Sequence, residues 1–545
     1  MFKKYVADLR HEFRGYNGRK LSQDLMSGLT VAAVALPLAL AFGVSSGADA
    51  ASGLITAIVA GLLIGAFSGA SYQISGPTGA MTAILLSLST RYGLEGVFTA
   101  GVLSGAILIL AAVFKIGKLV SYIPGPVITG FTSGIAIIIA LGQIDNFFGT
   151  ASTGDSAVKK LLSYGSTGFS PQLQTMLFGL IAIAVMVFYP KKLNAKFPSS
   201  LAAIIIALIV QLILGLDVAE VGAIPKTLFP EHRLQLSQID FANIKHLISP
   251  AVSIAALGMI ESLLCGASAG KMKNEKLDAQ RELVAQGIGN MIIPFFGGVP
   301  ATAAIARTSV AIKSGGHTRL VSVFHSATLV ASMFLLGPVM SRIPLSALAG
   351  VLMVTAWRMN DWSSIKNMFS KKLKNSGEQF FITMAATVVF DLTTAIVIGV
   401  VLSMLIFIVK SCELSVCVSD VDSRRLSKAG HDLAVPLENT KLVYLTGPLF
   451  FGTQDKLTAV LGELDDADSI VFSMRGVPMI DDSAIAELEM LFDRYTDEGV
   501  SIMFSGVQER VKNTMRRAGF VDNVGEDSFC WDAVSAISLL EKKYA

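Results

Sequence analysis

Long apolar segments dominate this chain and limit what it can fold into. Between residues 24 and 409 we identify about fourteen of them, several shorter than the ~20 residues that a straight helical crossing of a bilayer needs. They begin near residues 27, 51, 77, 95, 124, 172, 199, 247, 282, 302, 320, 344, 379 and 394. With 52% hydrophobic residues, 16% charged residues and a mean hydropathy of +0.61, the composition also departs from that of a soluble domain. The sequence predicts a polytopic α-helical membrane protein in a lipid bilayer.

The distribution of basic residues predicts the orientation. If the N-terminus lies inside, the inner loops carry 22 Lys and Arg residues and the outer loops carry 7. This bias follows the positive-inside rule. The first 26 residues carry six basic residues and no cleavage-type end, so we expect no removable signal peptide. We therefore expect a multi-pass protein of the cell (inner) membrane with both termini in the cytoplasm.

Faint internal repeats predict two related halves. "IPGPVITG" at 123–130 and "IPLSALAG" at 343–350 share the pattern I-P-x5-G. Pro77 and Pro300 each open a short segment rich in Gly, Ala and Thr, and the two prolines are separated by a similar interval. Seven segments in each half would start the second half from the opposite side of the membrane. The expected fold is a seven-plus-seven inverted repeat with two discontinuous half-helices.

The pattern changes after residue 410. "TKLVYLTGPLF", "SIVFSMRGV" and "VSIMFSG" have the β-branched character of strands, and "SAIAELEMLFDRYTDEG" has an apolar face typical of a helix. This alternation predicts a small cytoplasmic α/β domain. We divide the chain into an N-terminal cytoplasmic segment, a transmembrane domain and an α/β domain, over residues 1–23, 24–409 and 410–545.

Two predicted helix breaks indicate an anion site. "QISGPTGAM" and "FFGGVPATAAIARTSVAIKSGG" would each leave the N-terminus of a half-helix at membrane depth, near Thr78 and Thr302. A helix N-terminus carries unpaired N–H groups and the positive end of the helix dipole, and both attract anions. Irregular backbone at this depth is tolerated where it is buried in protein or lines a wet cavity.

Two ionisable residues fall inside the apolar segments. Arg307 is expected to lie little more than one turn beyond Thr302, where its charge would attract an anion; the alternative is a structural arginine that extends to the membrane surface. Glu261 would carry a coupling cation or proton, or pair with Arg307 as a structural ion pair. The hydroxyls of Ser75, Thr78, Thr302 and Thr308 are weaker candidates, because such groups often bond their own helix backbone.

These motifs together resemble the sulfate permease (SulP) family of anion transporters. The similarity rests on "ALPLALAFGVSSGADAASGL", "QISGPTGAMTAI", "GFTSGIAIIIALGQ", "GMIESLLCGASAG", "GGVPATAAIARTSVAIKSGG" and, near the end, "GVPMIDDSAIAELEML". The resemblance implies fourteen segments arranged as a core and a gate, elevator-like movement, a homodimer and a C-terminal STAS domain. It implies an anion site at Ser75, Gly76, Thr78, Ala304, Ala306, Arg307 and Thr308, and a proton or sodium site at Glu261 and Thr302.

The chain departs from the family pattern in two places. Its first three segments are similar to the sodium-coupled bicarbonate branch, but that branch has Asp at the position of Glu261 and lacks the arginine at Arg307. In the STAS domain, Ser483 stands at the position that related regulators phosphorylate, but its neighbours, Asp481, Asp482 and Ala484, differ from their Asp-Ser-Ser-Gly turn. Ser483 is a candidate regulatory residue, and the domain is expected to bind a regulatory protein or a nucleotide.

The leading function is secondary active transport of a small inorganic anion, sulfate or bicarbonate, with chloride and dicarboxylates still open. A passive anion channel or exchanger on the same fold and a membrane-tethered STAS signalling protein are the alternatives. We expect no enzyme, since the sequence has no phosphate loop, metal cluster or nucleophile elbow. We expect no nucleic-acid partner and no cofactor besides the coupling sodium ion or proton.

Overall fold

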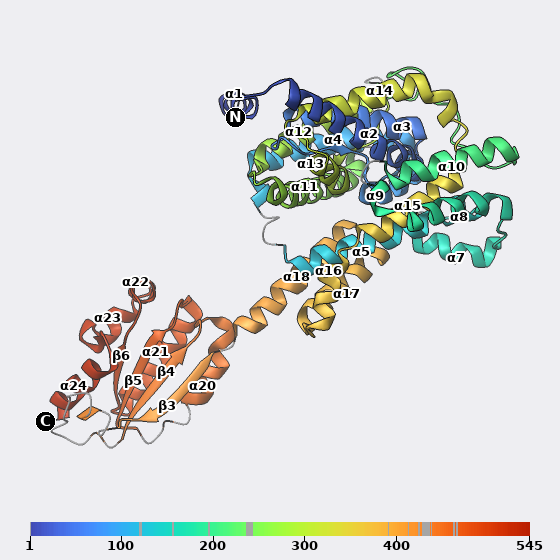
Figure 1. Ribbon diagram of the computed structural model, residues 1–545. Coiled ribbons are helices and arrows are strands. Elements are labelled where there is room, and N and C mark those ends of the chain that lie inside the picture. Colours follow the sequence, from blue (N-terminus) through green and yellow to red (C-terminus); the bar gives the residue numbers. More distant parts are fainter. Residues whose placement is uncertain are drawn as a thin grey trace. The chain divides into compact units, whose positions relative to one another are not determined.

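The structure is a computed structural model that describes residues 2–118, 123–154, 157–194, 197–235, 244–390, 392–412, 414–422, 426–427, 437, 439–461, 464 and 467–544 (Figure 1). The chain forms two compact units, Met1–Val401 and Leu402–Ala545. In the described residues, the regular structure of the first unit is helical apart from two very short strands, and the second unit contains a β-sheet.

Helices occupy all fourteen predicted segments. In chain order they are α2 (Gly18–Ser45), α3 (Ala50–Phe67), α4 (Gly79–Val113), α5 (Gly125–Gly142), α8 (Leu173–Phe188), α10 (Ser199–Leu214), α11 (Ile244–Lys273), α12 (Ala279–Ile292), α13 (Ile305–Lys313), α14 (Leu320–Met340), α15 (Leu345–Met359), α17 (Lys374–Val389) and α18 (Leu392–Ser411). Short helices connect or precede them: α1 (Phe2–Glu12), α6 (Ile144–Phe148), α7 (Ala157–Thr167), α9 (Lys191–Asn194), α16 (Trp362–Ser370) and the 3-10 turn Ile293–Phe296.

Helix α4 contains two of the predicted segments. Its backbone leaves the helical conformation at Gly93, where φ is 67° and ψ is −176°. Positive φ at this point favours glycine, because a Cβ would be strained. The break separates a first half-helix, which begins at Gly79, from a second helix, which begins beyond Gly93. This explains how one continuous element can hold the segments predicted near residues 77 and 95.

The transmembrane helices pack in two groups. Helices α2, α3, α4, α11, α12, α13 and α14 pack against one another and form what we call the core group. Helices α5, α8, α10, α15 and α17 form the gate group. Figure 1 shows the core group around the labels α2 to α4 and α11 to α14, and the gate group around α5, α8 and α15. The groups meet where α5 packs on α4 and where α10 and α15 pack on α2.

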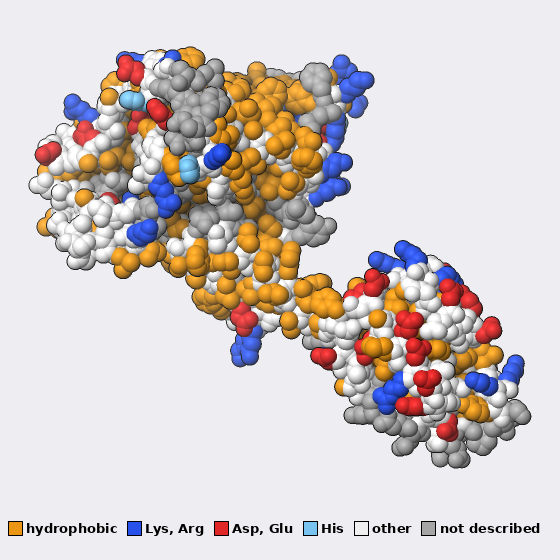
Figure 2. Space-filling view, turned by 180° about the vertical axis from the view of Figure 1, so that it is seen from behind, with side chains coloured by type: hydrophobic (Ala, Val, Ile, Leu, Met, Phe, Trp, Pro, Cys, Tyr) orange, Lys and Arg blue, Asp and Glu red, His pale blue; other side chains and the backbone are white. Residues whose placement is uncertain are grey.

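The outer surface of this unit is suited to lipid. Six spans in the described part of the chain are long and apolar enough to cross a membrane, and several shorter apolar helices accompany them. Leu173, Phe188 and Leu335 are each more than three-quarters exposed. Figure 2 shows hydrophobic side chains over a broad, continuous area of this unit. Exposed apolar area of this extent is stable in a bilayer rather than in water.

Helix α1 is fastened to the core group by ion pairs. Asp8 pairs with Arg281 at the start of α12, and Glu12 pairs with Arg319 at the start of α14, with a distance of 2.8 Å from Arg319 Nη2 to Glu12 Oε2. The two guanidinium groups lie over the ring of Tyr5, whose hydroxyl donates to the carbonyl oxygen of Ala66 at 2.8 Å. We call this set of contacts the N-terminal clasp.

The C-terminal unit is an α/β domain with a five-stranded sheet. The strands are β3 (Ser415–Asp420), β4 (Thr440–Thr446), β5 (Ser469–Gly476), β6 (Ser501–Ser505) and β7 (Phe529–Cys530), in that spatial order. Strand β3 is antiparallel to β4, and the other neighbours are parallel. The helices are α20 (Gln454–Leu461), α21 (Asp482–Asp497), α22 (Glu509–Arg517), α23 (Phe520–Val524) and α24 (Ala533–Tyr544). The three predicted strands are β4, β5 and β6, and the predicted helix is α21.

Candidate anion-binding site

Two short strands cross at the centre of the core group. Strand β1 (Ser75–Gly76) pairs with the antiparallel strand β2 (Thr302–Ala303), so that Ser75 lies opposite Ala303 and Gly76 opposite Thr302. Helix α4 begins three residues after β1, and α13 begins two residues after β2. The pairing therefore holds the N-termini of two half-helices, one from each half of the chain, at the same place.

The second half-helix begins later than the sequence predicted. We expected its N-terminus near Thr302, whereas α13 begins at Ile305. The reason is that Thr302 and Ala303 use their backbone to pair with β1, and the N–H of Ala304 donates to the carbonyl of Ile74 at 2.9 Å. Pro300 therefore lies before β2, whereas Pro77 lies directly after β1. Because α13 begins at Ile305, Arg307 lies in its first turn.

Neither half-helix has a side-chain cap at its N-terminus. Thr78 is the N-cap residue of α4, but its hydroxyl makes no cap hydrogen bond. Ala304 is the N-cap residue of α13 and has no polar side chain with which to cap it. The first intrahelical bonds start at Thr82 and Thr308, so the N–H groups before them lack intrahelical partners. Together with the two helix dipoles, these groups favour an anion.

Glu261 of α11 reaches this crossing from the side. Its Oε2 accepts a hydrogen bond from the hydroxyl of Thr78 at 2.9 Å, and the residue is half-buried. Thr302, the other predicted coupling residue, has its hydroxyl 2.9 Å from Ser262 Oγ and donates to the carbonyl of Gly258 at 3.2 Å. Thr302 therefore contacts α11 through Ser262 and Gly258, whereas Glu261, which belongs to α11, contacts the N-cap residue of α4.

Arg307 lies behind the crossing, on the buried face of α13. Only 2% of the residue is exposed, whereas Ile305 is 49% exposed and Ala306 is also exposed. Its Nη2 donates to the carbonyl of Pro77, which joins the two half-helix entrances. A Cβ at Gly76 would overlap the guanidinium, so a side chain there would displace Arg307 from this position. No ion pair joins Arg307 to Glu261 within the described residues.

Ser75 and Thr308 hold the strands rather than face open space. The hydroxyl of Ser75 accepts from Nε2 of Gln286 at 3.0 Å, and that of Thr308 accepts from the N–H of Ile74 at 3.1 Å. Both residues are at most 1% exposed. The structure thus brings the predicted membrane-site residues into one cluster, in which Ala304, Ala306 and Glu261 are the accessible members.

Sequence reasoning missed a buried polar stripe on α12. Glu282, Gln286 and Asn290 are four residues apart, on one helix face, and each is at most 1% exposed. Glu282 accepts from Ser68 Oγ at 2.6 Å, and Asn290 bonds both the N–H and the carbonyl of Ala301. The spacing of these residues in "ELVAQGIGN" was the available signal, because three polar residues on one face of an apolar helix need buried partners.

The crossing borders the gate group. A side chain at Gly79, the first residue of α4, would overlap Ile139 of α5 and come within 3.1 Å of Phe42 of α2. Nearby, Nε2 of Gln143, the C-cap residue that follows α5, donates to Ser45 Oγ at the end of α2, at 3.0 Å. The candidate site therefore lies where the two helix groups meet.

Ser483 belongs to the other unit. It is exposed in the first turn of α21, and its carbonyl accepts from Nε2 of Gln454 at 3.0 Å. Asp481 caps this helix by accepting from the N–H of Ala484 at 2.9 Å. The hydroxyl of Ser483 is therefore on the surface of a well-capped helix.

Comparison with known proteins agrees with this architecture. The model of the sulfate permease family matches residues 21–386, and the model of the STAS domain matches residues 433–534. The chain belongs to the sulfate permease family. The predicted STAS domain is thereby confirmed.

Relatives of the sulfate permease family match nearly the whole chain. The putative sulfate transporter YvdB of Bacillus subtilis (strain 168) is 34% identical over 534 residues, which cover 95% of this chain and 97% of the relative. The bicarbonate transporter BicA of Picosynechococcus sp. is 28% identical over 529 residues, or 93% of each chain. Both relatives are named as transporters and the family model is that of a permease, so the prediction that the chain is not an enzyme is confirmed.

Solved structures confirm the fold. The overall structure of SLC26A9 matches with a TM-score of 0.81 at 18% identity, over 98% of this chain and 92% of the other. The transmembrane domain of a cyanobacterial bicarbonate transporter BicA matches with a TM-score of 0.64 at 28% identity, over 71% of this chain and 98% of the other. The helical membrane fold with a C-terminal STAS domain is therefore the correct fold class.

Proposed function

We propose that this protein is a secondary active transporter of a small inorganic anion, sulfate or bicarbonate, coupled to protons or sodium. The observation that carries the proposal is the crossing of β1 and β2, which aims two uncapped half-helix N-termini at one place. Arg307 adds a full positive charge behind them. The relatives named for sulfate and bicarbonate transport support this substrate class.

Glu261 is the coupling residue in this proposal. A carboxylate that touches the N-cap residue of α4 is close enough to the anion site to respond to its occupancy. A sodium ion or a proton at Glu261 would offset its charge, which otherwise repels the anion. The cation and the anion would then bind together, and this linkage is the basis of symport.

Movement of the core group against the gate group would provide alternating access. The anion site is built by the core group alone, while Gly79 and Ser45 contact the gate group. A rigid core that carries its site past a gate would open that site to each side in turn, in the elevator-like manner. The STAS domain would regulate or assemble the transporter, as a homodimer, without forming the anion site.

Uptake in proteoliposomes tests this function. Radiolabelled sulfate and bicarbonate are offered with and without inward sodium and proton gradients, and unlabelled sulfate, bicarbonate, chloride and dicarboxylates compete. We expect one of the first two anions to accumulate above equilibrium only when a gradient is present. Uptake that reaches equilibrium regardless of either gradient would instead identify a passive channel or an exchanger.

A further inference from the structure

His325 of α14 is a buried polar group that the proposed transport cycle does not use. The residue is 0% exposed, and neither ring nitrogen has a hydrogen-bond partner in the protein. Leaving such a group unpaired in a buried site is costly, so native proteins normally satisfy it with protein or water. The guanidinium of Arg307 lies within electrostatic range of the imidazole.

Arg307 presents a second unpaired group. Its Nη2 is satisfied by Pro77, but its Nη1 is buried and has no partner in the protein. A guanidinium N–H has donor capacity only, whereas a neutral imidazole has one nitrogen that accepts. The two unpaired groups are therefore chemically complementary.

Both groups lie against the same face of α3. A Cβ on Gly61 would come within 2.9 Å of Nδ1 of His325. A Cβ on Gly76 would overlap Nη1 of Arg307 and come within 3.4 Å of the Cα of Ala57. Ala57 and Gly61 are four residues apart and so stand ~6 Å apart along the helix axis. Two hydrogen bonds of ~2.9 Å through one water span nearly that distance.

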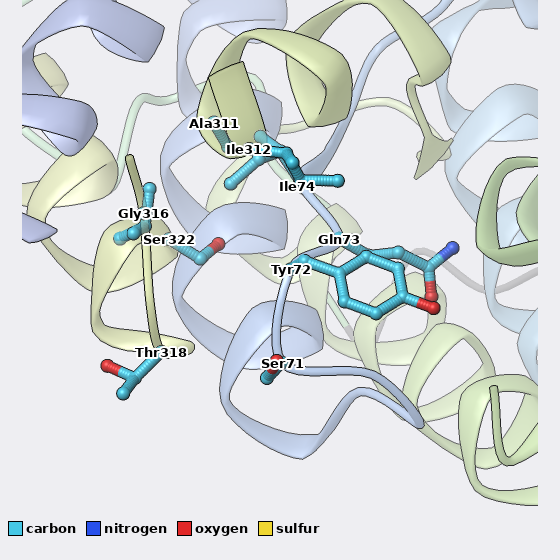
Figure 3. A pocket seen from close by; sticks show the side chains of 10 residues that line it. Ser71, Tyr72, Gln73, Ile74, Ala311, Ile312, Gly316, Thr318 and Ser322 are labelled. Atoms are coloured by element: carbon cyan, nitrogen blue, oxygen red, sulfur yellow. The ribbon is translucent and has the colours of Figure 1, made fainter. Parts of the chain in front are cut away.

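The same face of α3 continues to a small cavity. A Cβ on Gly65, four residues beyond Gly61, would overlap the hydroxyl of Ser322, which donates to the carbonyl of Gly61 at 2.6 Å. Ser322 also lines a small cavity with Ser71 and Thr318, and Figure 3 shows their hydroxyl groups around it. Gly61 and Gly65 thus leave room beside α3 for the polar side chains of His325 and Ser322.

We propose that a buried water joins Nη1 of Arg307 to a ring nitrogen of His325, and that His325 is a positioning residue for the guanidinium. The water accepts from the Nη1–H of Arg307 and donates to the neutral imidazole, and no proton is transferred. With Nη2 fixed by Pro77 and Nη1 fixed through His325, the charge is held behind the two helix N-termini. The effect on anion affinity rests on the proposed function; the bridge itself does not.

A double-mutant cycle in the full-length protein tests the bridge. His325→Leu removes both ring nitrogens, while His325→Gln keeps a donor and an acceptor for the water. Each is made alone and with Arg307→Ala, and thermal unfolding without added anion is measured for all. We expect His325→Leu to lower the melting temperature more than His325→Gln does, and this difference to disappear with Arg307→Ala. The bridge would be overturned if His325→Leu and His325→Gln lowered the melting temperature equally. It would also be overturned if their difference were the same with Arg307 and with Arg307→Ala.

Anion affinity is the second measurement, with sulfate and bicarbonate as the probes. We expect His325→Leu to weaken anion binding about 3- to 10-fold, which is the typical net contribution of one hydrogen bond. His325→Gln should recover most of that loss. If Arg307→Ala leaves affinity unchanged, the anion role of Arg307 fails, while the unfolding cycle still decides the bridge. If Arg307→Ala weakens binding but His325→Leu and His325→Gln bind equally, the positioning role of His325 is wrong.

Discussion

At the scale of single residues, Arg307 would act on the proposed anion site without entering it. The side chain is buried on the far side of α13 from the exposed Ile305 and Ala306. Its bond to Pro77 ties the entrance of α4 to the first turn of α13. The guanidinium therefore contributes to both the geometry and the electrostatic field of the crossing. We expect anion binding to depend on its planar shape as well as on its charge.

Replacing Arg307 tests this double role. We predict that Arg307→Ala weakens anion binding roughly 5- to 150-fold, which corresponds to the ~1 to 3 kcal/mol of a charge-assisted hydrogen bond. Arg307→Lys should recover only part of the loss, because it restores the charge but not the planar donor fork. Thermal shift on titration with sulfate and bicarbonate measures the affinities. Unchanged affinity in Arg307→Ala would remove this residue from the anion site.

Glu261 separates anion binding from coupling. We predict that Glu261→Gln still binds the anion in part but no longer accumulates it against a gradient, since the neutral amide cannot take up a proton or a cation. Glu95→Gln, at an exposed carboxylate of α4, is the matched control and should transport normally. Proteoliposome uptake with sodium and proton gradients measures both. Full gradient-driven accumulation by Glu261→Gln would show that the coupling ion binds elsewhere.

The residues found from sequence share one property. Arg307, Glu261 and the Thr78 region stand out because charge or a helix break is conspicuous in an apolar segment. Gln286 and Asn290 did not stand out, because an uncharged amide costs less in such a segment, and Ser75, the partner of Gln286, is distant in sequence. The sequence also could not show where the side chain of Arg307 points, because its guanidinium occupies the space that a Cβ at Gly76 would fill.

At the scale of elements, the two half-helices depend on a pairing that their own sequences hardly predict. Strands of two residues have no usable periodicity, so the start of α13 was placed three residues too early. Helix positions were easier to predict because long apolar runs define them. The break at Gly93 was also indicated, as a boundary between two predicted segments.

Crosslinks between helices test movement of the core group. In a cysteine-free background, Ser45→Cys with Gln143→Cys places thiols on α2 and at the end of α5, across the boundary of the two groups. Ser27→Cys with Ser314→Cys places them on α2 and at the end of α13, within the core group. We predict that a short bifunctional thiol reagent stops uptake in the first pair and spares it in the second. Transport by the fully crosslinked first pair would contradict movement between the groups.

At the scale of the whole molecule, the orientation of the chain is open to a direct measurement. We predict that single cysteines at Gly154 and Asn375 react with an impermeant thiol reagent from opposite sides of the membrane, with Asn375 labelled from the cytoplasm. The basis is the excess of Lys and Arg in the loops on the N-terminal side. Labelling of both positions from the same side would contradict the predicted topology.

The division of the chain into two compact units leads to a second prediction at this scale. All the proposed anion contacts precede residue 310, so a chain truncated after Ser411 should keep the same order of preference among anions. Folding yield, dimer formation and regulation should change more than this order of preference does. Competition assays on the purified truncated protein measure the preference. A well-folded truncation that ranks sulfate and bicarbonate differently from the full chain would mean that the STAS domain shapes selectivity.

The N-terminal clasp has a consequence for the order of events on the ribosome. Helix α1 is synthesised first, yet Arg281 and Arg319 are separated from their partners Asp8 and Glu12 by 273 and 307 residues. The first helix must therefore wait until most of the membrane unit has been translated before it can dock. Nascent chains that stop before Arg281 should leave α1 open to protease, and chains that extend past α14 should protect it.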